Sequence, residues 1–190
     1  MSLRFLQAFV SSPATVGAVW PSSPALARAI VGEANLGSAE SVVELGPGTG
    51  SFTRHIVGGL RPGAKFAALE KNEGFAEAIS RDFPGIRVIP GCATRLGEHL
   101  QSEKMPAPNA IISGLPWAIF DAELQTAILS QIQNSLADGG VFLTFAYYGP
   151  HRSAAGRRFR ANLDSLFGEV RRSRVVLWNF PPAFVYSCRR

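Results

Sequence analysis

Residues 42–50 of this 190-residue chain read VVELGPGTG, the segment most informative about its fold. A short apolar run leads directly into three glycines within five positions, Gly46, Gly48 and Gly50. Glycine lets the backbone turn sharply and approach a ligand where a side chain would collide. A strand that runs into such a turn and then into a helix is typical of a ligand-binding loop in a βαβ unit.

The glycine spacing is G-x-G-x-G, which differs from the G-x-G-x-x-G that holds a dinucleotide pyrophosphate. No Lys-Ser or Lys-Thr pair follows the loop, so a triphosphate-binding P-loop is excluded. A plain tight turn is the alternative, but it leaves the three closely spaced glycines unexplained.

Outward from this loop, short apolar runs alternate with helical patterns, which predicts an α/β, doubly wound fold. We expect a single-domain, Rossmann-like, seven-stranded and mostly parallel sheet with helices on both faces. The expected strands are residues 41–45, 65–69, 86–89, 110–113 and 140–147, followed by a hairpin-like pair at 174–178 and 183–188. The longest apolar stripe, residues 124–136, predicts a helix with Asp121 as its N-cap.

Residues 1–37 are interpreted as an N-terminal helical extension and residues 38–190 as the main domain. Ser23 followed by proline is a good helix start, so a cover helix is expected before Gly37. Nearer the N-terminus, one helical face carries Leu3, Leu6, Phe9 and Val10. Such a stripe could lie in a membrane interface or pack on the domain.

The composition, 46% apolar and 17% charged, is that of one ordinary globular domain. The two cysteines have no close partner in sequence and the three histidines lack ligand spacing, so neither a disulfide framework nor a metal site is expected. No apolar run is long enough to span a membrane, and residues 1–10 are too short and polar for a secretory signal. We therefore expect a cytoplasmic protein in a reducing compartment.

The net charge of +5 is concentrated near the C-terminus, where residues 151–190 hold nine arginines against Asp164 and Glu169. A basic surface attracts phosphate on nucleic acid or on an anionic membrane. A solvated face that only keeps the protein soluble is the alternative.

Two carboxylates accompany the glycine loop. Glu70 lies 20 residues past Gly50, at the end of the next expected strand, where ligands bind in parallel sheets. Its position suits two ribose hydroxyls, and Glu44 could bind a cationic amine directly or through water. Together they fit a ligand with a ribose and an amino acid tail, which is S-adenosylmethionine.

From residue 21 onward the sequence resembles the class I S-adenosylmethionine-dependent methyltransferases, which release S-adenosylhomocysteine. One position departs from the family pattern, because Cys92 stands where related enzymes often carry an aspartate that accepts from the adenine amino group. The resemblance implies cofactor contacts at Ser23, Glu44, Gly46, Pro47, Gly48, Gly50, Glu70, Lys71, Gly91, Cys92, Ala93 and Ser113.

Residues 113–117, SGLPW, occupy the place where related amine methylases carry a loop beside the reactive methyl. A rigid proline turn can present carbonyl groups to an amine and an aromatic face to its positive charge. The alternative for Trp117 is core packing. The catalytic candidates are Ser113, Gly114, Leu115, Pro116, Trp117 and Tyr148.

Two families share this loop. The rRNA adenine dimethyltransferases carry Asn in place of Ser113 and add a C-terminal helical domain for which this chain has no room, so RNA is the second choice. The closer resemblance is to the soluble bacterial phospholipid N-methyltransferases. Its marks here are residues 19–23, 43–50, 113–116, 148–149 and 179–186.

This resemblance implies methylation of phosphatidylethanolamine toward phosphatidylcholine by an enzyme attached peripherally to the inner, anionic face of the membrane, with no obligate protein partner. A non-catalytic protein that binds S-adenosylmethionine and docks on membranes is a further alternative, and a small-molecule amine acceptor stays open. The candidate ligands of the lipid phosphate are His151, Arg152, Arg157 and Arg158.

Overall fold

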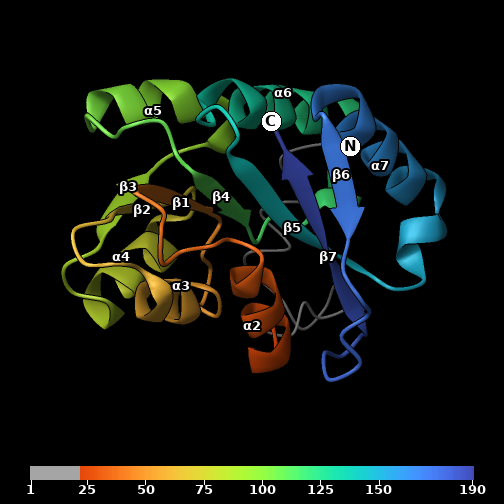
Figure 1. The fold of residues 1–190 in the computed structure, drawn as a ribbon, viewed down its shortest axis with the longest axis horizontal. Helices are drawn as coiled ribbons and strands as arrows, with labels where there is room; N and C mark the ends of the chain where they lie inside the picture. The colour runs from red at the N-terminus through yellow and green to blue at the C-terminus, as the bar shows by residue number, and fades with distance from the viewer. Residues whose placement is uncertain (1–21) are drawn as a thin grey trace.

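A seven-stranded sheet in the order β3-β2-β1-β4-β5-β7-β6 forms the centre of the protein (Figure 1). The structure, a computed structural model, describes residues 22–190. Six strands of the sheet run parallel, and only β7 runs antiparallel to its two neighbours. The strands are β1 (Ser41–Leu45), β2 (Lys65–Glu70), β3 (Arg87–Pro90), β4 (Ala110–Ser113), β5 (Val141–Tyr147), β6 (Glu169–Arg172) and β7 (Ala183–Arg189).

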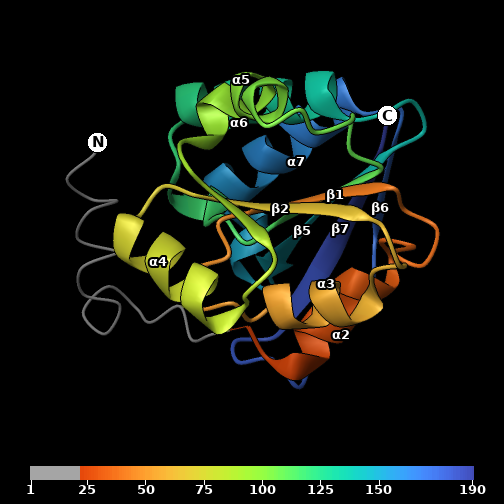
Figure 2. The same cartoon turned by 90° about the vertical axis from the view of Figure 1, so that its left-hand side faces the viewer.

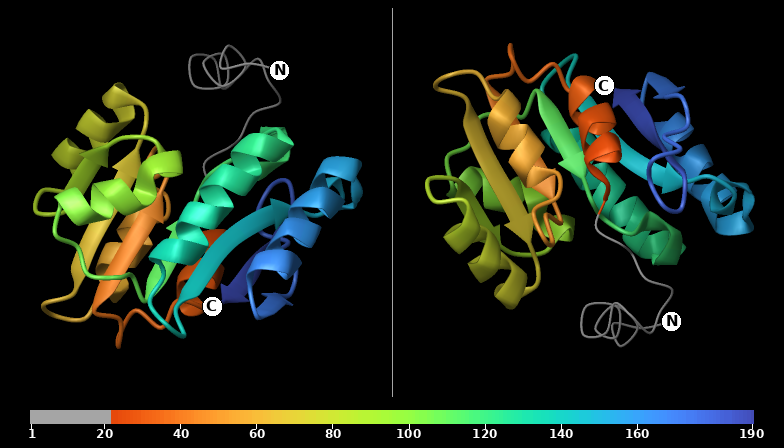
Figure 3. Two further views of the ribbon diagram at one scale, coloured as in Figure 1. Left: turned by 90° about the horizontal axis from the view of Figure 1, so that it is seen from above. Right: turned by 90° about the horizontal axis from the view of Figure 1, so that it is seen from below.

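Helices cover both faces of this sheet, which confirms the predicted α/β fold (Figures 2 and 3). One face carries α2 (Pro24–Gly32), α3 (Thr53–Gly59) and α4 (Glu73–Asp82), and the other carries α5 (Leu96–Ser102), α6 (Ala122–Ser135) and α7 (Ala154–Leu166). Three short 3-10 turns, η1 (Ala93–Arg95), η2 (Trp117–Ile119) and η3 (Pro150–Arg152), follow the ends of β3, β4 and β5.

The local sequence explains where the helices begin. The side chains of Ser23, Asn72, Asp121 and Ser153 each accept a hydrogen bond from a backbone N–H in the first turn of α2, α4, α6 and α7. Such caps satisfy N–H groups that have no partner inside the helix. The predicted caps at Ser23 and Asp121 are therefore confirmed.

Two apolar cores lie on opposite faces of the sheet. The central strands β1 and β4 are buried along their whole length, as expected of parallel strands covered on both sides. Residues alternate along them, so Val43 and Ile111 face α5, α6 and α7, whereas Val42 and Ile112 face α2 and α3. The resulting sandwich fixes the carboxyl ends of the strands relative to one another.

The structure corrects one predicted strand. The first partner of the C-terminal pair is Glu169–Arg172, not residues 174–178, and residues 173–182 form the connection to β7 with a single bridge between Val176 and Ala183. The reason is burial: β6 is an edge strand whose side chains are mostly exposed, so it shows no apolar run in the sequence. The second strand of the pair is as predicted.

The apolar stripe at Leu3, Leu6, Phe9 and Val10 lies outside the described residues, so the expectation of a membrane-contact helix there stays a prediction. Within residues 22–190, none of the helices has the length and apolarity that crossing a bilayer would require.

A buried glutamine on α6 holds the turn that follows β4. Gln125 is fully buried, and its Nε2 donates to the carbonyl oxygens of Trp117 at 2.7 Å and of Phe120 at 3.4 Å. Its Oε1 accepts from Asn162 of α7 at 3.4 Å. One side chain thus ties η2 to both helices above it.

Replacing Gln125 with methionine keeps the volume and removes these hydrogen bonds, so we expect the free energy of unfolding to fall by about 1–3 kcal/mol. Urea denaturation measures the change. The matched control is Gln133→Met on the half-exposed side of the same helix, which should change stability by less than about 0.5 kcal/mol. Equal losses in the two variants would show that the hydrogen bonds do not stabilise the turn.

Candidate active site

The candidate site lies at the carboxyl ends of the parallel strands. The chain passes from β1 to β2 on one side, whereas β4 lies on the other side of β1. Ligands of open α/β sheets bind at such a reversal of strand order, because the loops diverge there and leave a crevice. The glycine loop after β1 and the turn after β4 meet at this point.

The three loop glycines all adopt backbone conformations that L side chains rarely adopt, with φ of +69° at Gly46, +54° at Gly48 and +80° at Gly50. Two of them are also tightly enclosed: a Cβ on Gly46 would lie 2.8 Å from Leu115 Cδ2, and one on Gly50 would lie 2.7 Å from Phe83 Cε2. A Cβ on Gly48 would meet no atom within 4 Å. The open side of the loop is therefore at Gly48.

Glu70 stands at the end of β2 and braces this loop. Its Oε2 accepts from the backbone N–H of Gly48 at 3.1 Å, and its Oε1 accepts from the N–H of Asn72 at 2.9 Å. The carboxylate therefore lies beside the open glycine, as the sequence predicts. Its neighbour Lys71 is exposed.

Glu44 is fully buried at the base of the loop. Its Oε2 accepts from the Thr53 hydroxyl at 2.7 Å, but Oε1 has no hydrogen-bond partner among the described residues. Burial, opposed by the Thr53 hydrogen bond, raises the pKa of Glu44 from 4.5 to about 8. A hydrogen-bond donor would satisfy this unpartnered buried oxygen, and the ammonium group in the amino acid part of S-adenosylmethionine is such a donor.

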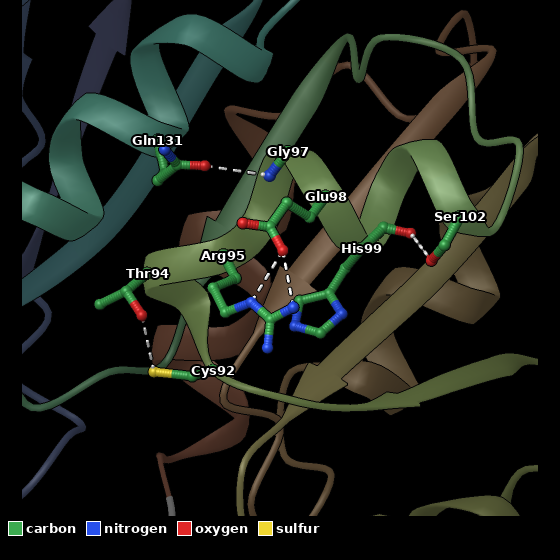
Figure 4. A network of polar contacts seen from close by, with 8 residues as sticks. All are labelled: Cys92, Thr94, Arg95, Gly97, Glu98, His99, Ser102 and Gln131. Atoms are coloured by element: carbon green, nitrogen blue, oxygen red, sulfur yellow. Dashed lines mark hydrogen bonds and ion pairs between the residues drawn. The ribbon is translucent and has the colours of Figure 1, made fainter.

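The turn after β3 lies beside the glycine loop and the end of β2 at the same edge of the sheet. The Gly91 N–H donates to the Glu70 carbonyl at 2.9 Å, and a Cβ on Gly91 would meet the His99 ring, so a larger residue there would require His99 to move. Cys92 is partly buried, and its sulfur accepts from the Thr94 hydroxyl at 3.2 Å (Figure 4). Ala93 packs against the core. In place of the carboxylate that related enzymes carry there, the structure thus has a thiol whose sulfur already accepts a hydrogen bond from Thr94.

The turn after β4 packs directly on the glycine loop. The Gly114 N–H donates to the Leu45 carbonyl at 2.8 Å, and a Cβ on Gly114 would lie 2.6 Å from the Gly46 carbonyl oxygen. Ser113 is buried, and its Oγ accepts from the Leu115 N–H at 3.2 Å. The candidate methyl-acceptor loop and the candidate cofactor loop are therefore in van der Waals contact.

For Trp117 the structure favours core packing over an open aromatic face. The side chain is 3% exposed and stacks on Phe159 of α7 with ring centroids 4.9 Å apart. Phe142 and Phe120 pack against it edge-on. Its indole Nε1 has no partner among the described residues. Because the Trp117 side chain is almost completely buried among these rings, it presents no open face to a methylammonium group.

Tyr148 is the exposed aromatic of the predicted set. It follows β5, is 46% exposed, and its backbone N–H donates to the Pro182 carbonyl at 2.7 Å. The Arg152 guanidinium lies 5.8 Å from the centre of its ring, and the His151 ring centroid lies 5.3 Å away. Tyr148 thus joins the end of β5 to the basic residues of η3.

A basic depression of about 650 Å³ lies between α7 and the β6–β7 pair. Three of the four predicted phosphate ligands line it, and Arg158 does not. Sequence reasoning missed Arg160 and Arg172, because only folding brings the helix and the edge strand together. The lining residues are His151, Arg152, Arg157, Arg160, Ala161, Asp164, Arg172 and Tyr186.

Two of the predicted cofactor contacts, Ser23 and Pro47, have structural positions of their own. The Ser23 hydroxyl caps α2, and the Ser23 N–H donates to Asn179 Oδ1 at 3.0 Å. Pro47 is buried within the glycine loop. Across residues 22–190, no three His, Cys, Asp or Glu side chains are grouped so that they could hold a metal ion.

Gly48→Ala should weaken S-adenosylmethionine binding at least tenfold, because the new methyl group enters the open side of the loop. The matched control is Gly63→Ala, whose glycine also has a positive φ of +80° and no atom within 4 Å of an added Cβ. Each variant should lose about 1 kcal/mol of stability from backbone strain. Calorimetric titration gives the affinities, and equal affinities in both variants would contradict a cofactor site at Gly48.

The Glu44 carboxyl should also make stability depend on pH. Because its pKa is about 8 in the folded protein and 4.5 ordinarily, the folded state binds more protons between these values. The free energy of unfolding should therefore fall as pH rises from about 5 to 8, with a slope of up to ~1.4 kcal/mol per pH unit. Urea unfolding at several pH values, compared with Glu44→Gln, isolates this slope. Parallel curves for the two proteins would mean that Glu44 titrates normally.

Some known proteins match this chain along its whole length, and others match only about half of it. The ornithine lipid N-methyltransferase of Singulisphaera acidiphila is 30% identical over 188 residues, covering 97% of this chain and 94% of that protein. The ribosomal RNA small subunit methyltransferase A of Cutibacterium acnes is 34% identical over 100 residues, which cover 48% of this chain and 31% of that protein. No family model matches the chain.

Among solved structures, an O-methyltransferase from Bacillus cereus in complex with S-adenosylhomocysteine superimposes with a TM-score of 0.71. It is 16% identical and the match covers 98% of this chain and 89% of that one, so it supports the fold. The relative that matches along the whole length, the glycine loop and the two carboxylates all indicate the same family. The chain therefore belongs to the class I S-adenosylmethionine-dependent methyltransferases, the family of the ornithine lipid N-methyltransferase, and S-adenosylmethionine is its cofactor.

Proposed function

We propose that this protein is an N-methyltransferase of membrane aminolipids, with phosphatidylethanolamine and its methylated derivatives as substrates on the way to phosphatidylcholine. The observation that carries the proposal is the match to a lipid N-methyltransferase along almost the entire chain. The matches to ribosomal RNA enzymes are restricted to about half of the chain.

The residues of the site have distinct tasks in this reaction. S-adenosylmethionine supplies an electrophilic methyl group on a sulfonium. Glu44 would hold the cationic amino acid end, and Glu70 the ribose, so that the cofactor lies along the open side of Gly48. The turn after β4, whose backbone touches the glycine loop, would present its carbonyl groups to the incoming amine. Holding two reactants in this way can lower a barrier by roughly 7–11 kcal/mol.

The basic depression would bind the anionic part of the lipid. Among the described residues, Arg160 is paired with Asp164 at 2.8 Å, whereas no acidic side chain pairs with Arg152, Arg157 or Arg172. Arginine forms bidentate hydrogen bonds with phosphate oxygens, which suits a phosphodiester headgroup. The depression begins at η3, directly after β5, so a bound headgroup would extend toward the carboxyl edge. A peripheral position on the inner, anionic face of the membrane follows from this proposal.

Ornithine lipids are a second candidate substrate class, because the whole-length relative is named for them. Adenine in ribosomal RNA is a third, favoured by the partial matches. A protein that binds the cofactor without transferring its methyl group is the non-catalytic alternative.

Transfer of labelled methyl from S-adenosylmethionine separates these possibilities. The acceptors are phosphatidylethanolamine in vesicles, ornithine lipid in vesicles, and ribosomal RNA, each in its own reaction. Labelled mono-, di- or trimethylated phosphatidylethanolamine is the expected result. Label only in ornithine lipid or only in RNA would replace the proposed substrate, and bound cofactor without transfer to any acceptor would favour the non-catalytic alternative.

Arg152→Gln combined with Arg157→Gln should raise the KM for phosphatidylethanolamine about tenfold or more, because two charge-assisted contacts to the headgroup are lost. The Kd for S-adenosylmethionine should stay unchanged. The matched control is Arg81→Gln, which removes an exposed arginine on α4, across the sheet. An unchanged KM in the double variant would place the headgroup elsewhere.

A further inference from the structure

The connection between β6 and β7 carries the most exposed large apolar side chains among residues 22–190. Leu177 is 74% exposed, Trp178 is 88% exposed and Phe180 is 80% exposed. They lie within four consecutive positions of the loop between β6 and β7, and this loop extends beyond the end of the sheet in Figure 1. We call residues 177–180 the apolar tip. Single exposed apolar residues are common, but three together on one projection indicate an interaction surface.

Hydrogen bonds hold the base of this loop. Asn179 is 4% exposed and points inward: its Nδ2 donates to the Pro181 carbonyl at 2.7 Å, and its Oδ1 accepts from the Ser23 N–H at 3.0 Å. The Val176 N–H donates to the Ala183 carbonyl at 2.7 Å. The fold therefore anchors the polar residue of the tip and presents its three apolar neighbours to the outside.

The charge around the tip is of one sign. Residues 170–190 contain five arginines and no acidic residue. Arg172 and Arg174, both exposed, come just before the tip, and Arg172 lines the basic depression described above. Aromatic and aliphatic side chains next to arginines are typical of segments that lie in the interface of an anionic membrane, where the rings enter the headgroup boundary and the cations remain at the surface.

The size of the tip argues against a stable protein interface. Such interfaces bury about 800 Å² on each partner. Two aromatic side chains supply roughly 300–500 Å², since an aromatic side chain buries about 150–250 Å², and one leucine adds less than either of them. A projecting tip of this size suits insertion into a lipid surface, which needs no complementary shape.

The tip also lies at the functional edge of the molecule. The Ser23 N–H bonded to Asn179 belongs to the N-terminus of α2, and the Pro182 carbonyl accepts from the N–H of Tyr148, directly after β5. The parallel strands end at this edge, and the glycine loop opens there. A membrane contacted by the tip would therefore face the same edge as the cofactor loop.

We propose that the apolar tip, Leu177, Trp178 and Phe180, inserts into the headgroup region of an anionic bilayer, with Arg172 and Arg174 at the lipid surface, and so presents the active-site edge to the membrane. This inference rests on the proposed lipid substrate and adds the surface by which the enzyme reaches it.

The test uses the full-length protein and vesicles of phosphatidylethanolamine and phosphatidylglycerol, with brominated acyl chains as quenchers. The chain has three tryptophans, Trp20, Trp117 and Trp178, and the variant Trp178→Phe removes only the last, so the difference in emission between the wild type and this variant reports on position 178. We expect this difference signal to shift to shorter wavelength and to be quenched by the brominated lipid. An unshifted, unquenched signal on bound vesicles would overturn the proposal.

The second measurement is vesicle partitioning of Trp178→Ser combined with Phe180→Ser. Partitioning should fall at least tenfold, with unchanged thermal stability, because both side chains are largely exposed. The control is Val57→Ser, which replaces an apolar residue that is 39% exposed on α3, away from the active-site edge. Equal partitioning of the tip variant and this control would overturn the proposal, as would wild-type protein that binds a second copy of itself, another protein or RNA through the tip and not vesicles.

Activity distinguishes failure of this inference from failure of the proposed function. The tip variant should methylate a short-chain, water-soluble phosphatidylethanolamine at the wild-type rate but lose methylation of vesicle lipid at least tenfold. Equal wild-type and variant rates on vesicles would contradict the proposed docking surface but not the proposed lipid substrate. Insertion of Trp178 without methylation of any lipid would support the docking surface and contradict the proposed substrate.

Discussion

The contact between the glycine loop after β1 and the turn after β4 sets the geometry of the active-site edge. The two backbones approach so closely there that a Cβ on Gly114 would lie 2.6 Å from the Gly46 carbonyl oxygen, while one on Gly46 would meet the Leu115 side chain. This contact joins the segment that would hold the cofactor to the segment that would receive the acceptor amine. It also explains why both segments follow neighbouring central strands: only strands paired in register bring their loops together with such precision. The surrounding helices keep this arrangement rigid by covering both faces of the sheet.

The buried carboxyl of Glu44 shows how the site departs from what stability alone would favour. A glutamate whose second oxygen lacks a partner costs free energy in the free protein, and the Thr53 hydroxyl offsets only part of it. A cationic ligand group would restore the balance by supplying the missing donor. On the proposed function, the amino group of the bound cofactor would be that donor. Glu70 differs, since two backbone N–H groups already satisfy its oxygens and hold the loop in place.

Much of the fold followed from apolar periodicity, because the central strands are buried on both faces and their sequences are continuous apolar runs. The edge strand β6 was placed wrongly for the same reason: it is mostly exposed and rich in arginine, so its sequence looks like a loop. The apolar run at 174–178, which resembles a strand, belongs instead to a connection in which Val175 and Val176 are half-buried and Leu177 and Trp178 are exposed. Periodicity detects burial, and it fails where apolar residues face outward.

The part of the site that lies on two strands consecutive in sequence could be predicted. The glycine loop, Glu44 and Glu70 lie on consecutive strand ends, so their proximity could be inferred. The environment of Trp117 could not, because Phe159 comes from α7, far along the chain. The basic depression likewise combines η3, α7 and β6, and Arg160 and Arg172 become neighbours only after the edge strand has paired. Side-chain clusters that join distant elements need the tertiary structure.

The position of β7 has a consequence for how this protein folds during synthesis. β7 comes after every other strand in sequence, yet it pairs between β5 and β6, and α2 packs against it with Leu26 and Ile30 in the same core as Val185. Until residues 183–189 leave the ribosome, the edge of β5 is unpaired and the first described helix lacks part of its packing surface. Contacts between such distant parts of a chain form slowly. The nascent chain therefore exposes the edge of β5 until residues 183–189 have emerged, a period in which chaperones would protect this edge from pairing with other chains.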